Sequence, residues 1–341
     1  MSSSNPTVTA SRAAVAPFEY PDLWRSVWAV INTLVPFFVL WYLMYRSLSV
    51  SYWLTLALAL PASGFYVRTF ILFHDCGHGS LFRSRLANDV LGVATGVLTL
   101  TPYYAWRHSH AIHHATAGNL DRRGIGDIRT LTVREYKELP PLRRLVYRVY
   151  RNSLAWLLFG PVTVFVITQR FFSGVGGRRE RYSVYSTNLI LLTLVGIMWA
   201  TIGLKAFLLV HLPIIWLGGA IGIWLFYVQH QFEGTTWNRK PDWDFTEAAL
   251  HGSSFLPLPR LLDWFSGSIG YHHIHHLSPR IPHYRLARCY AESPALQVKP
   301  LSLWAGIKAM FLSLWDEDER RLVGFRALRR AQRMTQALPP D

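Results

Sequence analysis

Residues 53–78 read WLTLALALPASGFYVRTFILFHDCGH, an apolar run long enough to cross a bilayer that leads directly into two histidines. His74 and His78 stand at i and i+4, so a helix that continues through them presents both imidazoles on one face. The stretch therefore predicts a membrane-spanning helix with metal-binding side chains at its end.

Two more histidine clusters follow, HAIHH at residues 110–114 and HHIHH at residues 272–276. The spacing i, i+3 and i+4 predicts that the three imidazoles of each cluster converge beside a helix. We interpret the lone histidine after a later apolar run, His230, as a further ligand at the same membrane face. The candidate metal ligands are His74, His78, His110, His113, His114, His230, His272, His275 and His276.

The number and type of these ligands indicate the metal. About four ligands close a zinc site, whereas nine imidazoles suit two six-coordinate ions with a position left open for O₂. Imidazole also favours iron over the hard ions Mg²⁺ and Ca²⁺. The sequence therefore predicts a non-haem di-iron centre.

Four apolar stretches have the length of a membrane span, and the long segment between the second and the third is rich in arginine. The positive-inside rule places that segment, and with it both termini, in the cytoplasm. A borderline run at residues 153–168 is expected to lie at the interface, because a crossing there would put the clusters on opposite sides of the membrane. The four predicted spans are residues 27–45, 53–73, 186–204 and 206–228.

The expected fold is an all-α integral membrane protein with four transmembrane helices and a cytoplasmic helical cap that holds the histidine-ligated di-iron site. The C-terminal stretch from Leu301 to Leu314 has helical spacing, and we expect an amphipathic helix there. The predicted regions are a disordered N-terminus (1–20), a first transmembrane hairpin (21–73), a cytoplasmic segment with the first two clusters and interfacial helices (74–185), a second hairpin (186–228), and a cytoplasmic cap with the third cluster and a basic tail (229–341).

Composition agrees with a membrane protein, since 51% of the 341 residues are hydrophobic and only 16% are charged. The net charge of +15 suits anionic lipid or an acidic protein partner, and no nucleic-acid-binding motif accompanies it. Two cysteines cannot supply a disulfide framework, so histidine is the obvious source of metal ligands.

The chain resembles the membrane fatty acid desaturase family, whose hallmark is three histidine boxes of the forms HxxxH, HxxHH and HxxHH. Longer stretches are similar to the bacterial acyl-lipid desaturases: TPYYAWRHSHAIHHATAGNLDRRGIGDIRTLTVREY (101–136), FYVQHQFEGTTW (226–237) and GYHHIHHLSPRIPHYRL (270–286). The resemblance implies a di-iron centre on the cytoplasmic face, with the eight box histidines as ligands. His230 matches the family's additional histidine, and His273 is an extra one inside the third box.

The implied activity is O₂-dependent introduction of a cis double bond into the acyl chain of a membrane lipid, in the bacterial inner membrane. No cytochrome b5-like HPGG motif occurs, so we expect a separate electron donor, a ferredoxin-like or other acidic protein. Two alternatives stay open at this point. One is a hydroxylase, acetylenase or carotenoid or sterol oxygenase on the same scaffold, and the other is a non-catalytic metal-binding or transport protein.

Overall fold

The computed structural model describes residues 6–328 and is predominantly helical within them. The helices are α1 (Pro6–Val15), α2 (Leu23–Ser47), α3 (Tyr52–His78), α4 (Arg85–Leu98), α5 (Tyr103–Thr116), α6 (Val133–Glu138), α7 (Pro141–Tyr150), α8 (Ser153–Pro161), α9 (Arg178–Ile202), α10 (Leu204–His230), α11 (Phe245–His251), α12 (Arg260–Phe265), α13 (His272–Leu277), α14 (His283–Glu292) and α15 (Leu303–Ala309). The strands are β1 (Leu131–Thr132), β2 (Leu314–Asp316) and β3 (Arg321–Val323).

Five helical segments of the described chain are long and apolar enough to cross a membrane. Helices α2, α3 and α10 contain three of the predicted spans, and α9 contains the remaining one except for its last two residues, 203 and 204. The fifth, Ser153–Arg170, comprises α8, a π-helical stretch and a 3-10 turn, and it is the run that the sequence predicts to lie at the interface. Large apolar side chains such as Leu192 and Trp199 of α9 are exposed, as expected of surfaces that face lipid.

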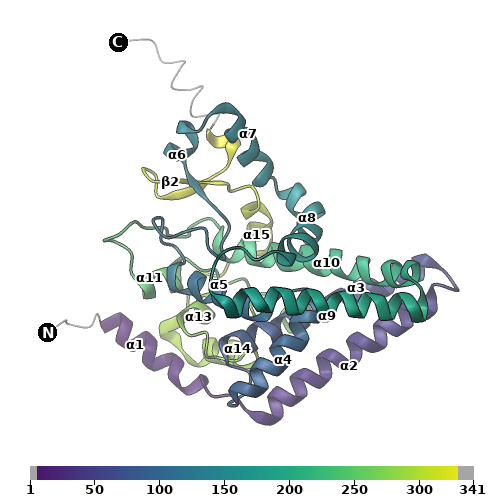
Figure 1. Cartoon of the computed structure of the whole chain (residues 1–341). Helices are drawn as coiled ribbons and strands as arrows, with labels where there is room; N and C mark the ends of the chain where they lie inside the picture. Colours follow the sequence, from purple (N-terminus) through teal and green to yellow (C-terminus); the bar gives the residue numbers. More distant parts are fainter. Residues whose placement is uncertain (1–5, 329–341) are drawn as a thin grey trace, which may run out of the picture.

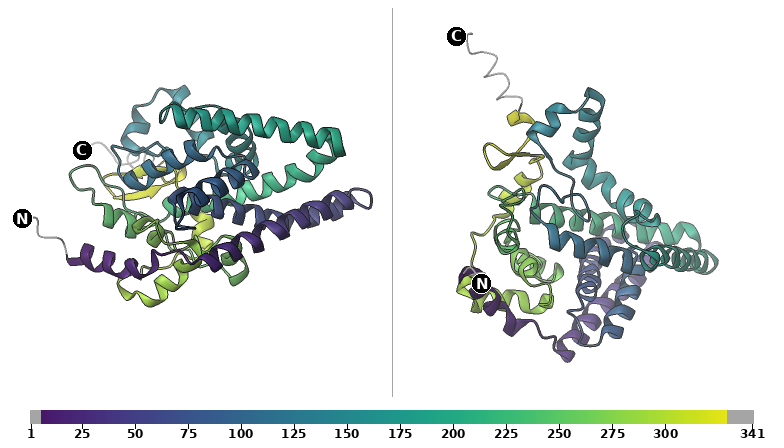
Figure 2. Two further views of the ribbon diagram at one scale, coloured as in Figure 1. Left: turned by 60° about the horizontal axis from the view of Figure 1, so that its bottom comes forward. Right: turned by 60° about the vertical axis from the view of Figure 1, so that its left-hand side comes forward.

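The four long helices form two hairpins, α2–α3 and α9–α10, whose turns point toward the same end of the molecule (Figure 1 and Figure 2). Helix α3 packs against both α2 and α10. The ends of α3 and α10 remote from these turns carry His78 and His230, and α5 and α13 lie at that end. The hairpins therefore bring together histidines that are far apart in the sequence.

The N-terminal segment differs from the disorder predicted for residues 1–20. From Pro6 onward the chain forms α1 and a 3-10 turn (Ala16–Phe18). Val15 and Phe18 are buried in the core that also contains Ile274 and Leu277 of α13. These two apolar side chains hold the segment in place, because their burial opposes the loss of chain entropy.

The C-terminal region is not a single amphipathic helix. Helix α15 ends at Ala309, and Leu314 lies in β2 of a three-stranded sheet with the order β1-β2-β3. Strand β2 pairs in parallel with β1 and antiparallel with β3, so that Leu314 is opposite both Leu131 and Val323. These buried apolar residues override the helical spacing, and the all-α expectation fails here. The predicted basic tail beyond residue 328 lies outside the described residues.

A buried guanidinium ties this sheet region to the end of α10. Arg151, which is 2% exposed, donates to Thr130 Oγ1 (3.2 Å), Tyr227 Oη (3.0 Å), Gln231 Oε1 (2.9 Å) and the carbonyl oxygen of Leu312 (2.9 Å). The Arg151 guanidinium therefore connects its own segment to those of Thr130, α10 and Leu312 by hydrogen bonds.

We expect Arg151→Leu to lower the free energy of unfolding by about 3 kcal/mol, because it leaves buried acceptors without donors. Unfolding of the purified protein in detergent, followed by circular dichroism, measures the change. Arg143→Leu on the exposed surface of α7 is the matched control. Equal stability of the two variants would show that the Arg151 contacts do not contribute.

Candidate metal centre

The first histidine pair lies on the last turn of α3, inside the protein. Helix α3 ends at His78 because Gly79 follows with a φ of 68°, a left-handed conformation that glycine adopts readily. His74 is buried, and its ring lies 4.7 Å from that of His78, measured between centroids. The long apolar helix α3 thus carries two neighbouring imidazoles at its C-terminal end.

The second cluster lies on α5 and the third on α13, and both are buried. His110, His113 and His114 are 1–7% exposed, and all six residues of α13 are buried. His230 is the last residue of α10 and is 3% exposed. The structure thus brings together all nine histidines that the sequence singles out.

The nine histidines divide into two groups, and in each group the possible ligand atoms lie within 4.8 Å of one another. The first group is His74, His78, His110, His114 and His275. The second group is His113, His230, His272 and His276.

Each HxxHH motif contributes to both groups, so the expectation that its three imidazoles converge on one point is wrong. His113 separates from His110 and His114, and His275 separates from His272 and His276. The reason is helical geometry. Residues i and i+4 point the same way to within about 40°, whereas i+3 and i+4 differ by about 100° around the axis. Each motif can therefore bind at two neighbouring positions.

Distances between ring nitrogens fit the coordination of metal ions. In the first group, His114 Nε2 lies 3.1 Å from both His110 Nε2 and His275 Nε2. In the second, His230 Nε2 lies 3.1 Å from His113 Nε2 and 3.0 Å from His272 Nε2. Ligands at 90° with metal–nitrogen distances of about 2.1 Å would be about 3.0 Å apart. The observed separations are those of neighbouring ligands.

Unpaired nitrogens point to the same conclusion. Within the described residues, His78 Nε2 in the first group and His276 Nε2 in the second are buried without a hydrogen-bond partner. Leaving such an atom unpaired is costly, and a cation between the rings would satisfy it. The residues present therefore fit a metal ion in each group.

Burial also keeps these imidazoles in the form that binds metal. Desolvation, with a smaller contribution from neighbouring histidines, lowers the pKa of several rings well below the usual range. A neutral imidazole has a lone pair for a metal, whereas a protonated one does not. The rings concerned are those of His110, His113, His114, His272, His275 and His276.

Neighbouring side chains hold the ligands in place. Asp75 Oδ1 lies 3.7 Å from His74 Nδ1. Asp75 Oδ2 accepts hydrogen bonds from the backbone N–H of His283 (2.9 Å) and from its Nδ1 (2.7 Å). On α5, the Trp106 ring stacks on His110 with centroids 4.2 Å apart. The stacking on Trp106 restricts the orientation of the His110 ring, and Asp75, held by His283, places a negative charge beside His74.

The other histidines have different surroundings. His273 is fully buried, but its Nε2 lies 3.0 Å from the carbonyl oxygen of Leu296, and it belongs to neither group. His211 stacks on Phe207 within α10. His108 and His251 are exposed. Sequence reasoning missed Trp106, although its position four residues before His110 places both on one helix face.

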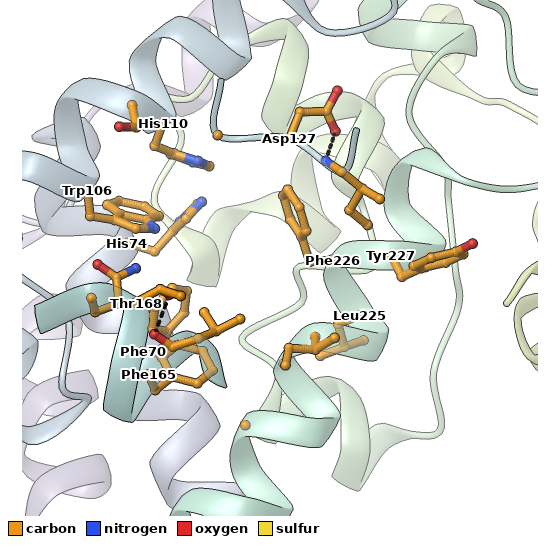
Figure 3. A pocket seen from close by; sticks show the side chains of 18 of the residues that line it. Phe70, His74, Trp106, His110, Asp127, Phe165, Thr168, Leu225, Phe226 and Tyr227 are labelled. Atoms are coloured by element: carbon orange, nitrogen blue, oxygen red, sulfur yellow. Dashed lines mark hydrogen bonds between the residues drawn. The ribbon is translucent and has the colours of Figure 1, made fainter. Parts of the chain in front are cut away.

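A cavity of about 530 Å³ extends from the histidines into the space between the long helices. His74 and His110 line it together with aromatic side chains of α3, α5 and α10, and Figure 3 shows Trp106, Phe70 and Phe226 around it. Its lining is mainly apolar. A slender hydrophobic molecule would therefore lie beside the histidines with few polar contacts.

Comparison with known proteins identifies relatives. The model of the fatty acid desaturase family matches residues 47–305. A protein named fatty acid desaturase from Bacillus subtilis (strain 168) is 47% identical over 328 residues, covering 96% of this chain and 92% of the relative.

More distant relatives have more specific names. The sn-1 acyl-lipid omega-3 desaturase (ferredoxin) of Nostoc sp. (strain 36) is 29% identical over 64% of this chain and 61% of its own length. The acyl-lipid omega-3 desaturase (cytochrome b5), endoplasmic reticulum, of Arabidopsis thaliana is 30% identical over 64% of this chain and 58% of its own length.

Proposed function

The chain belongs to the fatty acid desaturase family, and we propose that it introduces a cis double bond into an acyl chain of a membrane lipid with O₂ and two iron ions. The observation that carries this proposal is the position of the two histidine groups at an apolar cavity. In the net reaction, two adjacent methylenes lose two hydrogens. One O₂ takes these up with two electrons and two protons from outside, and leaves as two water molecules.

The nine histidines of the two groups are the proposed iron ligands. Bound iron would supply the activation of O₂ and the removal of hydrogen from an unactivated methylene. The protein's own residues hold the rings, exclude bulk water and align the substrate. Phe70, Trp106 and Phe226 give the acyl chain an apolar environment, so that a fixed part of it lies beside His74 and His110.

Four membrane spans with the site on the cytoplasmic side remain the proposed topology. The start of α9 supports it, because Ser183 Oγ accepts from the backbone N–H of Tyr104 on α5 (3.0 Å). The end of α3 and the start of α9 therefore lie on the same side of the membrane. The chain between them must then cross the membrane an even number of times. We propose that Ser153–Arg170 lies within the membrane boundary without crossing it.

We propose that the electrons come from a separate acidic protein. The name of the Nostoc relative specifies ferredoxin, and the name of the Arabidopsis relative specifies cytochrome b5. The net charge of +15 supports an acidic donor of the ferredoxin kind, since opposite charges speed association. The bacterial inner membrane is the proposed location, with both termini in the cytoplasm.

Expression in a bacterium without desaturases, together with a suitable electron donor, tests the proposed function. We expect new cis-unsaturated acyl chains by mass spectrometry and about two iron atoms per purified chain. In His113→Ala, desaturation should be lost and the iron content should fall to about one atom per chain, because only the second histidine group is damaged. Both signals should be kept in His108→Ala, an exposed histidine of the same helix. Hydroxylated lipids, or bound zinc with unchanged lipids, would contradict the proposal.

One glycine of α10 offers a test of the acyl cavity. Gly222 lines the cavity, and a Cβ atom built on it meets no other atom within 4 Å. By contrast, a Cβ on Gly218 would lie 2.6 Å from the ring of Tyr66, and one on Gly219 would lie 2.9 Å from Pro161 Cβ. A larger side chain can therefore enter the cavity at residue 222 without displacing the helix.

We expect Gly222→Leu to reduce desaturation of long acyl chains about tenfold, because the added side chain occupies the substrate's space. Iron content should stay at the wild-type value. Gly196→Leu on α9 is the control, since a Cβ there also meets nothing and the residue does not line the cavity. Products are compared by gas chromatography. Equal loss in both variants, or in neither, would contradict the placement of the acyl chain.

A further inference from the structure

A second cavity, of about 390 Å³, lies where α2, α3, α12 and α14 meet. None of the nine candidate iron ligands lines it. Its polar lining residues, tryptophans apart, are Arg25, Asn32, Arg68, Arg260, Asp263, Ser268, His283 and Tyr284. We call it the arginine cleft.

The arginine cleft carries excess positive charge. Three of its lining residues are arginines and one is an aspartate. Within the part of the chain that the structure describes, none of Arg25, Arg68 and Arg260 has a carboxylate within 4.0 Å. Asp263 Oδ2 accepts from Ser268 Oγ (2.8 Å). The cleft can therefore accept an anion.

Arg68 is the most buried cation of the cleft, since the residue is only 5% exposed. Its Nε donates to Thr33 Oγ1 (3.1 Å), and Nη1 donates to the carbonyl oxygen of Trp264. The guanidinium carbon lies 4.0 Å from the centre of the Trp264 ring. These contacts fix the group in the cleft but use only two of its five N–H donors. Donors therefore remain for the oxygens of an anion, although Asp263 already offsets part of the positive charge.

The rim of the arginine cleft has the features of a membrane interface. Trp28 of α2 is 63% exposed, and on α12 Leu261 is 66% and Trp264 36% exposed. Exposed tryptophans beside arginines are typical of the depth at which lipid phosphates lie. A guanidinium fork also matches the oxygens of a phosphate.

We propose that the arginine cleft binds the phosphate of an anionic membrane lipid, separately from the acyl cavity. Arg68 contacts the phosphate from inside, and Arg25 and Arg260 close over it from the rim. Phosphate chemistry alone would also admit a free phosphate ion, so the test must distinguish the two sources.

The test uses the purified full chain in bilayer discs of phosphatidylcholine with a minor share of phosphatidylglycerol. Native mass spectrometry after release counts the phosphatidylglycerol retained per chain, with and without excess inorganic phosphate. The cleft variant is Arg25→Gln with Arg260→Gln, since both side chains are exposed and their loss leaves the Arg68 contacts in place. The control is Arg83→Gln with Arg85→Gln, which removes the same charge from exposed positions outside the cleft.

We expect about tenfold less retained phosphatidylglycerol in the cleft variant, wild-type retention in the control, and no displacement by inorganic phosphate. Displacement by phosphate that depends on Arg25 and Arg260 would overturn the lipid assignment in favour of a soluble ion. Equal retention in all three proteins would overturn the site itself. Because the count does not depend on desaturation, its outcome is independent of the proposed function.

Discussion

Replacing His230 with alanine is expected to abolish desaturation, with a fall of at least about 100-fold, and to lower the iron content from about two atoms per chain to about one. His230 Nε2 lies 3.1 Å from His113 Nε2 and 3.0 Å from His272 Nε2, so it is central to the second histidine group. Its removal leaves three histidines in that group and five in the first. The loss should therefore affect one metal position more than the other.

The control for this variant lies in the same helix. His211→Ala removes an imidazole from α10 that stacks on Phe207 and belongs to neither histidine group. We expect wild-type iron content and nearly wild-type activity from it. Iron is measured by mass spectrometry of the purified proteins, and activity by lipid products. Full iron content in His230→Ala would remove His230 from the proposed ligands, and equal losses in both variants would indicate a general defect of α10.

The second large effect is expected from Asp75→Asn, which should lower activity and iron affinity by 10- to 100-fold, or about 1 to 3 kcal/mol of binding free energy. Asp75 is 2% exposed and connects two histidines. One of its oxygens lies 3.7 Å from His74 Nδ1, and the other accepts from His283 Nδ1 at 2.7 Å. Asparagine keeps the shape but removes the charge, so His74 loses the carboxylate beside its ring and His283 loses a charged hydrogen-bond acceptor.

Asp121→Asn is the matched control for Asp75→Asn. Asp121 lies on the surface, where its carboxylate accepts from Arg239 Nη1 at 2.6 Å, and it belongs to neither histidine group. An exposed ion pair of this kind contributes little to stability. Iron-binding titrations of the two variants, with unfolding curves beside them, separate a loss of affinity from a loss of fold. Equal affinities would show that Asp75 does not orient His74.

Sequence reasoning was most successful where the signal is local. The span at residues 53–73 and the spacing of His74 and His78 both depend on neighbours within a few turns of one helix, and α3 contains both. Predictions from the sequence were wrong where contacts between residues far apart in the chain determine the local structure. Leu314 follows helical spacing but pairs with Leu131 in a sheet, and residues 6–20 fold because Val15 and Phe18 find a buried surface far along the chain.

The sequence by itself determined the four long apolar helices of the hairpins, the nine candidate ligands and the family, since hydrophobic length, helical spacing and motifs are written in consecutive residues. Only the tertiary structure decided which histidine joins which group, because His113 and His275 turn away from their own motifs toward partners on other helices. The tertiary structure also places an apolar cavity beside the histidines, and it places Arg68 in a separate cleft. Cavities and partners arise between elements that are distant in the chain, where spacing along the sequence carries no information.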